Sequence, residues 1–284
     1  MILLTGGTGQ VGRYVANNLK RDNLVFVAPT RAEFNLNELD TISTFLVGKT
    51  FKTVLHVAAE TNVDLCESDP EGALRRNFES TKMLAEYCAL NGSRFVFVSS
   101  AGALSGEDEL MHLESATPSP CNVYAESKAL AEDFIRANNS NYVILRAAWM
   151  LGKSSNVKKF AELMVEKISA NQDVSAVFDK FGSLTSARRF ANLISTLIDS
   201  DEVGTFNIGS RTPCSRYDVA KEIAWRLSSK SNVEPVPSSM FKLPAPRGFS
   251  EGLDSTQAQL ILGYEALKWE DELQEFMNEL NIGG

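Results

Sequence analysis

The sequence contains few of the residues that hold metal ions in proteins. It has two histidines, His56 and His112, and four scattered cysteines without any C-x-x-C pair: Cys66, Cys88, Cys121 and Cys214. Because a metal site needs several such residues grouped at characteristic spacings, we predict that the protein holds no metal. His56 ends an apolar, strand-like segment, which favours a packed, hydrogen-bonded ring over a catalytic base.

Long apolar runs and an excess of positive charge are also missing. No run approaches the ~18 residues of a membrane span, and the formal net charge is -8. An acidic chain without a basic stripe repels nucleic acid and anionic lipid, so we expect neither as a partner. The chain starts with the apolar run Ile2–Leu4, which leaves no room for a signal peptide, and we expect a cytoplasmic protein with free thiols.

Short apolar, β-rich runs alternate with helical patterns through the first half of the chain. The runs are Ile2–Thr5, Leu24–Ala28, Thr53–Val57, Phe95–Ser99 and Tyr142–Arg146. Strands that are apolar throughout and separated by helices are typical of a parallel sheet covered on both faces. The sequence therefore predicts an α/β fold with a doubly wound parallel (Rossmann) sheet.

A glycine-rich stretch, residues 6–12, lies between the first strand and a helical pattern. Gly6 would permit the tight turn, Gly9 the close approach of a pyrophosphate, and Gly12 close packing of helix on strand, while the helix N-terminus attracts the phosphate charge. We predict a dinucleotide site that also includes Gln10 and Val11. The alternative, a plain strand-to-helix turn, is disfavoured by the flanking strand and helix.

The segment after the second strand indicates which dinucleotide binds. An acidic residue there would bind the adenosine ribose, whereas a basic one would bind its 2′-phosphate. Here Val25–Ala28 leads to Arg31, and no carboxylate precedes Glu33. Because arginine suits a bidentate phosphate contact, we predict NADP(H) in preference to NAD(H). A solvated Arg31 is the alternative.

The candidate catalytic residues are Ser100, Tyr124 and Lys128. Ser100 follows an apolar strand, and ligands of open α/β sheets bind at such carboxyl ends. Tyr124 and Lys128 lie four residues apart, on one face of a predicted helix. The lysine would lower the tyrosine pKa and make the phenol a general acid, while Ser100 would bind a substrate carbonyl oxygen. A surface Tyr and Lys would be the commoner explanation for the spacing alone.

The pattern changes after Leu151. Helical stretches are expected at residues 157–169, 186–198, 217–227 and 269–280, strand-like runs at 174–178 and 204–208, and irregular structure at the proline-rich 233–250. We predict a dinucleotide-binding domain over residues 1–150, with 185–210 returning to it. Residues 151–184 and 211–284 would form most of a smaller C-terminal α/β substrate-binding lobe.

The motifs together resemble the extended short-chain dehydrogenases/reductases, and specifically the dTDP-4-dehydrorhamnose reductase family. Five stretches carry the resemblance: TGGTGQVG, HVAAETNVDLCESDP, NVYAESKALAE, LRAAWMLG and DKFGSLT, spread from residue 5 to residue 185. The segment Thr30–Leu36 is also similar to the NADPH-binding stretch of GDP-fucose synthases. The resemblance implies reduction of the 4-keto group of a nucleoside-diphosphate deoxysugar, with hydride from NADPH and a proton from Tyr124.

The resemblance also implies roles for individual residues. Ala58, Ala59 and Thr61 would line the cofactor, Asn35 and Leu36 would lie near the adenine, Asn77 would support the site, and Lys128 would also hold the nicotinamide ribose. The implied substrate contacts are Trp149, Phe181, Gly182, Thr185 and Arg247. Ordinary core packing is the alternative for the two aromatic residues. The loop before Tyr124, with the acidic run 107–109, His112 and Glu114, would lie beside the site or be solvated.

Three departures from the family pattern concern the sugar. Where the family usually reads S-T-D-Y-V-F, this chain has Ser99-Ser100-Ala101-Gly102-Ala103-Leu104, which lacks the acidic and aromatic residues. The second departure is at residues 247–254, which read RGFSEGLD where the family usually has R-P-x-x-S-x-L-D. The third is Leu184, which occupies the place of the proline in the family's G-x-P-T turn. The chemistry would survive these changes, whereas recognition of the sugar would change.

Two other functions and a homodimer are alternative interpretations of the sequence. An epimerase-reductase of a related nucleotide sugar would need a second acid or base, for which Cys121 and His112 are merely close in the chain. A non-catalytic NADP-binding regulatory subunit would not need the catalytic residues. A homodimer could form through the helix faces with Met83, Leu84, Tyr87, Cys88, Leu130 and Phe134, for which core packing is an equal explanation.

Overall fold

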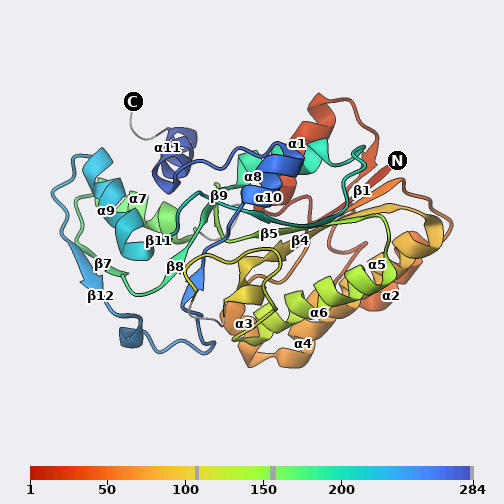
Figure 1. The fold of residues 1–284 in the computed structure, drawn as a ribbon, viewed down its shortest axis with the longest axis horizontal. Coiled ribbons are helices and arrows are strands. Elements are labelled where there is room, and N and C mark those ends of the chain that lie inside the picture. The colour runs from red at the N-terminus through yellow and green to blue at the C-terminus, as the bar shows by residue number, and fades with distance from the viewer. Residues whose placement is uncertain (106–108, 154–157, 282–284) are drawn as a thin grey trace.

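The structure, a computed structural model, describes residues 1–105, 109–153 and 158–281 (Figure 1). Its α-helices are α1 Gln10–Arg21, α2 Leu39–Leu46, α3 Val63–Ser68, α4 Pro70–Leu74, α5 Ser80–Asn91, α6 Val123–Asn138, α7 Phe160–Ser169, α8 Ala187–Thr196, α9 Arg216–Arg226, α10 Thr256–Leu262 and α11 Trp269–Glu279. A π-helical turn, Arg75–Glu79, joins α4 to α5, and short 3-10 turns occupy Ala101–Leu104 and Ser238–Met240.

The strands form one large sheet and three small ones. They are β1 Ile2–Thr5, β2 Phe26–Val27, β3 Thr53–His56, β4 Arg94–Ser100, β5 Tyr142–Ala147, β6 Trp149–Leu151, β7 Val174–Val177, β8 Phe181–Gly182, β9 Leu184–Ser186, β10 Gly204–Ile208, β11 Cys214–Ser215, β12 Val233–Val236 and β13 Ser250–Glu251. The predicted strand at 24–28 is present but shortened to two residues.

The large sheet has six strands in the order β10-β5-β4-β3-β1-β2, and every pair in it is parallel. The chain first moves from β1 to β2 and then returns to the other side of β1 through β3, so the winding direction reverses between β1 and β3. Ligands of doubly wound sheets bind at such a reversal, outside the carboxyl ends of the strands. The predicted fold class is confirmed.

Helices cover both faces of this sheet (Figure 1). On one face α1 and α8 pack together, and their apolar side chains share a core with Leu4, Leu145 and Phe206 from the strands. On the other face α2, α5 and α6 cover a second core that contains Phe95 and Phe97. Both faces are buried, which explains why the strands are apolar throughout rather than alternating.

The remaining strands lie in the part of the molecule that carries α7, α9 and α11 (Figure 1). They pair as β11-β8-β13, β12-β7 and β6-β9. The prediction of irregular structure throughout residues 233–250 is wrong at β12, where Pro235 pairs in parallel with Ala176 of β7. Proline is tolerated there because each strand of a two-stranded sheet has an open edge. The division into two domains stays a prediction, although β10 adds residues 204–208 to the large sheet.

Two predictions fall partly outside the described residues: 107 and 108 of the acidic run, and Val157 at the start of the expected helix, which is described from Phe160. Within the described ranges, no helix has the length and apolar character that crossing a membrane requires. Over the same ranges, no three His, Cys, Asp or Glu side chains are grouped as metal ligands.

Candidate active site

The glycine-rich loop connects β1 to α1 in a tight turn that only glycine fits. Gly6 has φ +70°, and a Cβ on it would lie 2.7 Å from the backbone nitrogen of Ala58. A Cβ on Gly12 would lie 2.0 Å from the carbonyl oxygen of Gly6. Gly6 therefore makes the turn, and Gly12 lets α1 lie against that turn, as the glycine spacing predicts.

The N-terminus of α1 suits a phosphate group. Its N-cap, Gly9, offers no side-chain cap, and the first turn carries no acidic residue. The backbone N–H groups at the start of a helix have no partner within the helix, and together with the helix dipole they attract an anion. The backbone nitrogens of residues 10–12 can thus donate to a pyrophosphate, whereas the nitrogen of Gly9 donates to the carbonyl oxygen of Gly6 at 2.9 Å. The side chain of Gln10 is engaged elsewhere, since its Nε2 donates to the carbonyl oxygen of Gly152 at 2.7 Å.

Arg31 lies after β2 as the sequence predicts, and its side chain is exposed. It forms no ion pair with any carboxylate of residues 1–105, 109–153 and 158–281. The nearby Glu33 turns back on the chain, because its Oε2 accepts hydrogen bonds from the nitrogen and hydroxyl of Thr30 at 2.9 and 2.8 Å. These bonds lower the pKa of Glu33 and occupy the one carboxylate that could have bound a ribose. Asn35 bonds Thr41 and Glu38, and Leu36 is half-buried.

The loop after β3 is held by Asn77. Its Oδ1 accepts from the nitrogen of Glu60 at 2.8 Å, and its Nδ2 donates to the carbonyl oxygen of Glu60 at 3.0 Å and to Ser127 Oγ at 3.2 Å. Asn77 is buried in the π-helical turn, a feature often found at functional sites. It fixes the loop that contains Ala58, Ala59 and Thr61 against α6. Its predicted supporting position agrees with this geometry.

The structure brings Ser100 and Tyr124 together. Ser100 ends β4, its Oγ accepts from the nitrogen of Gly102 at 3.1 Å, and its side chain lies close enough to Tyr124 to lower the pKa of the phenol. Tyr124 is in the first turn of α6, which begins where the side chain of Asn122 caps the nitrogen of Ala125. Asn122 also donates to the carbonyl oxygen of Pro246 at 3.0 Å. This bond ties the start of α6 to the segment that precedes β13.

Lys128 lies on the same helix but does not act on Tyr124 as predicted. Its Nζ donates to the carbonyl oxygen of Val98 at 2.9 Å and lies 4.5 Å from the ring centre of Phe97. Burial lowers the pKa of Lys128 to about 8, against the opposing charge of Glu132. Burial also raises the pKa of Tyr124 to about 12, although the side chain of Ser100 works in the other direction. The expected lowering of the tyrosine pKa is therefore wrong for this structure, because desolvation dominates.

Glu132, which sequence reasoning missed, connects the catalytic helix to the catalytic strand. Its buried carboxylate accepts from Ser99 Oγ at 2.5 Å, from the guanidinium of Arg146 at 2.7 to 3.1 Å, and from Arg136 at 3.0 Å. Arg146 is 1% exposed, and Glu132 is fully buried. Two guanidinium groups thus surround one buried carboxylate. The four-residue spacing from Lys128 to Glu132 was the available signal.

Trp149 faces a charged group that the sequence did not single out. Its Nε1 donates to Glu251 Oε2 at 2.8 Å, and the guanidinium of Arg216 lies 3.8 Å from its ring centre. A Cβ on Gly182 would lie 2.6 Å from the ring, so this glycine makes room for the indole. Burial lowers the pKa of Arg216 to about 10 and raises that of Glu251, each opposed by the charge of the other. Trp149, Arg216 and Glu251 are half-buried, whereas Gly182 is buried.

Two predicted substrate residues are engaged within the protein. Thr185 is fully buried, and its hydroxyl donates to the carbonyl oxygen of Ile208 at 3.0 Å, so a direct contact with substrate is wrong for this residue. Arg247 donates to Asp64 Oδ1 at 2.9 Å and to the carbonyl oxygen of Ala245 at 2.7 Å. Its charge nevertheless acts on Glu251. Phe181 is half-buried and packs edge-on against Phe249.

His56 is a packed, hydrogen-bonded residue, as expected. Its Nδ1 lies 2.7 Å from Thr5 Oγ1 and its Nε2 lies 3.0 Å from Thr81 Oγ1. Thr5 Oγ1 already accepts from the nitrogens of Val57 and Ala58, so its hydrogen points to Nδ1 and the ring carries its own on Nε2. Burial and then the charge of Lys128 lower the pKa of His56 to about 3.

His112 and Cys121 are also engaged within the protein. His112 is buried, and its Nε2 lies 3.1 Å from the carbonyl oxygen of Ser250. Cys121 Sγ lies 3.6 Å from Ser105 Oγ. Neither side chain is therefore placed to exchange a proton with a sugar.

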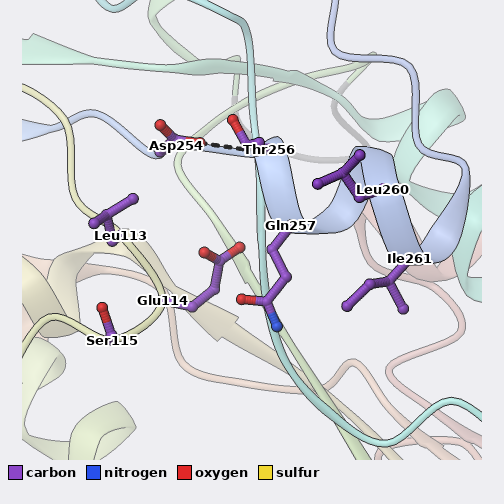
Figure 2. A pocket seen from close by; sticks show the side chains of 8 residues that line it. All are labelled: Leu113, Glu114, Ser115, Asp254, Thr256, Gln257, Leu260 and Ile261. Carbon is purple, nitrogen blue, oxygen red and sulfur yellow. Dashed lines mark hydrogen bonds between the residues drawn. The ribbon is translucent and has the colours of Figure 1, made fainter.

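A pocket lies between α10 and the loop that follows His112 (Figure 2). Side chains of α10 form one wall and the loop 113–115 forms the other, with Leu113, Glu114, Ser115, Asp254, Thr256, Gln257, Leu260 and Ile261 around it. Glu114 Oε1 accepts from the nitrogen of Asn207 at 3.0 Å. Glu114 therefore lies in this pocket and supports β10, rather than the candidate site.

Comparison with known proteins places this geometry in a family. The family model described as "RmlD substrate binding domain" matches residues 1–282. The chain belongs to this family. The dTDP-4-dehydrorhamnose reductase of Burkholderia thailandensis is 26% identical over 285 residues, covering 94% of this chain and 95% of that protein.

Two solved structures of similar proteins have the same overall fold. The dTDP-4-dehydrorhamnose reductase from Yersinia enterocolitica superimposes with a TM-score of 0.93 at 33% identity, covering 98% of both chains. The dTDP-4-dehydrorhamnose reductase from Bacillus anthracis, in complex with NADP, gives a TM-score of 0.89 at 25% identity, again covering 98% of both chains. The predicted resemblance is confirmed, and so is the enzyme class. The protein is an NAD(P)-dependent oxidoreductase of the short-chain dehydrogenase/reductase type.

Proposed function

We propose that this protein reduces the 4-keto group of a nucleoside-diphosphate deoxysugar with NADPH, as its relatives named dTDP-4-dehydrorhamnose reductase suggest. One observation carries the proposal for this chain. The side chains of Ser100 and Tyr124 meet at the carboxyl edge of the sheet that also presents the glycine-rich loop. A carbonyl group and a dinucleotide can therefore meet at one edge.

NADPH, when bound, supplies the hydride that reaches the carbonyl carbon. Ser100 and Tyr124 act on the carbonyl oxygen, where negative charge develops. Ser100 donates a hydrogen bond, and Tyr124 gives its phenolic proton to the oxygen, which completes the alcohol. With a pKa near 12 the phenol carries its proton at neutral pH, and transfer of that proton is driven by the negative charge that develops on the substrate oxygen. Lys128, one turn along α6 from Tyr124, holds the nicotinamide ribose.

The donor atoms of residues 6–12 support binding of the pyrophosphate, with Gln10 and Val11 contributing their backbone nitrogens. Arg31 binds the 2′-phosphate, because it is exposed and has no carboxylate partner in the part of the chain that the structure describes. Ala58, Ala59 and Thr61 line the cofactor on the loop that Asn77 holds, with Asn35 and Leu36 near the adenine. The complex of the Bacillus anthracis relative with NADP supports the choice of cofactor.

On the sugar side, Trp149 and Phe181 border the substrate, and Gly182 acts by making room for the indole. Arg216 is the cation best placed for the diphosphate, since within the described ranges it has neither a hydrogen-bond acceptor nor a salt-bridge partner. Arg247 shares its charge with Asp64 and adds to the same positive region. The sequence showed no basic stripe because these two arginines are 31 positions apart in the chain.

Neither alternative function has comparable support. His112 and Cys121 are both hydrogen-bonded within the protein, so they do not supply the second acid or base of an epimerase. A regulatory subunit would have no need of Ser100 beside Tyr124.

A homodimer remains a proposal with a narrower surface than expected. Leu84 and Cys88 belong to the core under α5, and Met83, Tyr87 and Phe134 pack partly buried against it, which leaves Leu130 of α6 exposed. A cytoplasmic location is likewise a proposal. It is supported by four free cysteines, since no pair of them is bonded.

The function is tested by following NADPH oxidation with a panel of 4-keto nucleotide sugars, including dTDP-4-dehydrorhamnose. We expect turnover with at least one 4-keto sugar and none with the corresponding 4-hydroxy sugars. NADPH binding without oxidation in the presence of every 4-keto sugar would contradict the proposal.

A further inference from the structure

Glu251 is a carboxylate beside the proposed catalytic pair that no motif assigns to the site. A Cβ built on Gly102 would lie 3.3 Å from Ser100 Oγ and 3.9 Å from Glu251 Oε1, so the carboxylate and the serine hydroxyl border the same small space. The charge of Glu251 also acts on Tyr124. The hydroxyls of Ser100 on β4 and Tyr124 on α6 are proposed to bind the carbonyl group, and the carboxylate of Glu251 on β13 lies close to both.

We propose that Glu251 is a specificity-determining residue that accepts a hydrogen bond from a sugar hydroxyl on the ring carbon next to the carbonyl carbon. The proposal rests on the proposed function, because it takes the position of the carbonyl group from Ser100 and Tyr124. The ligand class it implies is a 4-keto nucleotide sugar with a hydroxyl at C3.

The two carboxylate oxygens of Glu251 have different surroundings. Trp149 donates to Oε2 at 2.8 Å and fixes the orientation of the group. Oε1 accepts no hydrogen bond from residues 1–105, 109–153 or 158–281. A half-buried carboxylate oxygen without a donor costs free energy that a ligand hydroxyl would recover. Oε1 is therefore the atom available to the sugar.

Burial raises the pKa of Glu251, and the charge of Arg216, the bond from Trp149 and the charge of Arg247 each act against that rise. In its ionised form the carboxylate accepts hydrogen bonds and donates none. It therefore selects a donor such as a hydroxyl and disfavours a methyl or methylene group at the same place.

Two glycines allow this approach of Glu251 to Ser100. A Cβ on Gly248 would lie 1.9 Å from the carbonyl oxygen of Ser105, so this glycine lets the segment before β13 lie against the turn after Ser100. Gly102, on that turn, has no side chain between Ser100 Oγ and Glu251 Oε1. The space beside the proposed carbonyl position is thus open to a sugar hydroxyl.

The test compares dTDP-4-dehydrorhamnose with its 3-deoxy counterpart in wild type and in Glu251→Ala. We expect wild-type kcat/KM to be at least about tenfold lower for the 3-deoxy sugar, as for one lost hydrogen bond to a charged group. Glu251→Ala should lower kcat/KM for the hydroxylated sugar about tenfold and bring the ratio between the two sugars close to one. Glu251→Gln, which keeps an acceptor oxygen, should retain part of the preference.

The matched control is Glu234→Ala, which removes an exposed carboxylate of β12 that accepts from Ser175. It should leave both sugars unchanged. NADPH affinity should be unchanged in all three variants, which shows that they are folded.

Three results would overturn the proposal. The first is wild-type turnover that is equal for the two sugars and unaffected by Glu251→Ala. The second is Glu251-dependent exchange of the C3 or C5 hydrogen in D2O, which would make Glu251 a base rather than a binding group. The third is NADPH binding without turnover of either sugar, which would remove the proposed function and this inference together.

Discussion

The hydroxyl of Ser99 donates to the buried carboxylate of Glu132 across 2.5 Å. Ser99 directly precedes Ser100 on β4, and Glu132 lies two turns after Tyr124 on α6. The bond therefore links the strand and the helix that carry the proposed catalytic hydroxyls. Because Arg146 of β5 binds the same carboxylate, three neighbouring elements are joined at one buried point.

Glu132→Gln should destabilise the protein. The substitution leaves the guanidinium of Arg146, which is 1% exposed, without a negative partner. Breaking a buried ion pair in this way costs about 3 kcal/mol of unfolding free energy, measurable by urea denaturation. The control Glu86→Gln, in an exposed pair with Lys82 at 3.9 Å, should cost under about 0.5 kcal/mol. If Glu132→Gln lowered the free energy of unfolding as little as Glu86→Gln does, the ion pair of Glu132 with Arg146 would not be important for stability.

Tyr124→Phe should abolish NADPH oxidation and leave NADPH binding unchanged. The variant removes the proton donor while keeping the ring, and Tyr124 is not part of the glycine-rich loop. Stopped-flow or steady-state absorbance measures the first effect and fluorescence titration the second. Tyr142→Phe, at the amino end of β5, is the matched control and should keep full activity. Turnover by Tyr124→Phe at the wild-type rate would rule out the proposed role.

Arg31→Ala should raise the KM for NADPH about 10- to 100-fold, the range for losing hydrogen bonds between charged groups. The KM for NADH should not change, because NADH lacks the 2′-phosphate. Initial rates at varied concentrations of each cofactor measure both effects. Lys20→Ala, which removes an exposed cation near the C-terminal end of α1, serves as the control. If both cofactors were affected equally, Arg31 would not contact the 2′-phosphate.

Stability should fall below pH 6.5 partly because of His56. Its pKa is about 3 in the folded protein against an ordinary 6.5, so between these values the unfolded chain binds a proton that the folded protein does not. Lowering the pH through this window favours unfolding by about 1.4 kcal/mol per pH unit from this residue. His56→Gln should be less stable at pH 7 but should lose that part of the pH dependence. Equal slopes between pH 6 and 4 in urea denaturation would contradict the assignment.

The parts of the site that are contiguous in sequence could be predicted. Residues 6–12 form the expected turn, because the glycines stand at the positions where the fold leaves no room for a side chain. Tyr124 and Lys128 lie on one helix, as a four-residue spacing requires. Ser100 ends β4 at the carboxyl edge of the sheet, where ligands of open α/β sheets bind, and its side chain lies near Tyr124.

What could not be predicted depends on distant segments and on burial. Glu251 lies in β13 and Arg216 in α9, and neither residue belongs to a sequence motif that indicates a site. The lysine at position 128 was expected to lower the tyrosine pKa, but its ammonium group bonds the carbonyl oxygen of Val98, and desolvation raises the pKa instead. Thr185 was expected at the substrate, yet the pairing of β9 with β6 encloses it.

The segment 247–254 is separate in the chain from the residues proposed for catalysis. Gly248 and Glu251 bring it beside the turn after Ser100, while the residues proposed for proton and hydride transfer all precede position 130. On the proposed role of Glu251, exchanges within this eight-residue stretch, together with Gly102 on the facing turn, would change the sugar preference and leave the proposed catalytic residues in place. Grafting such stretches between relatives offers a direct route to reductases with altered sugar preference.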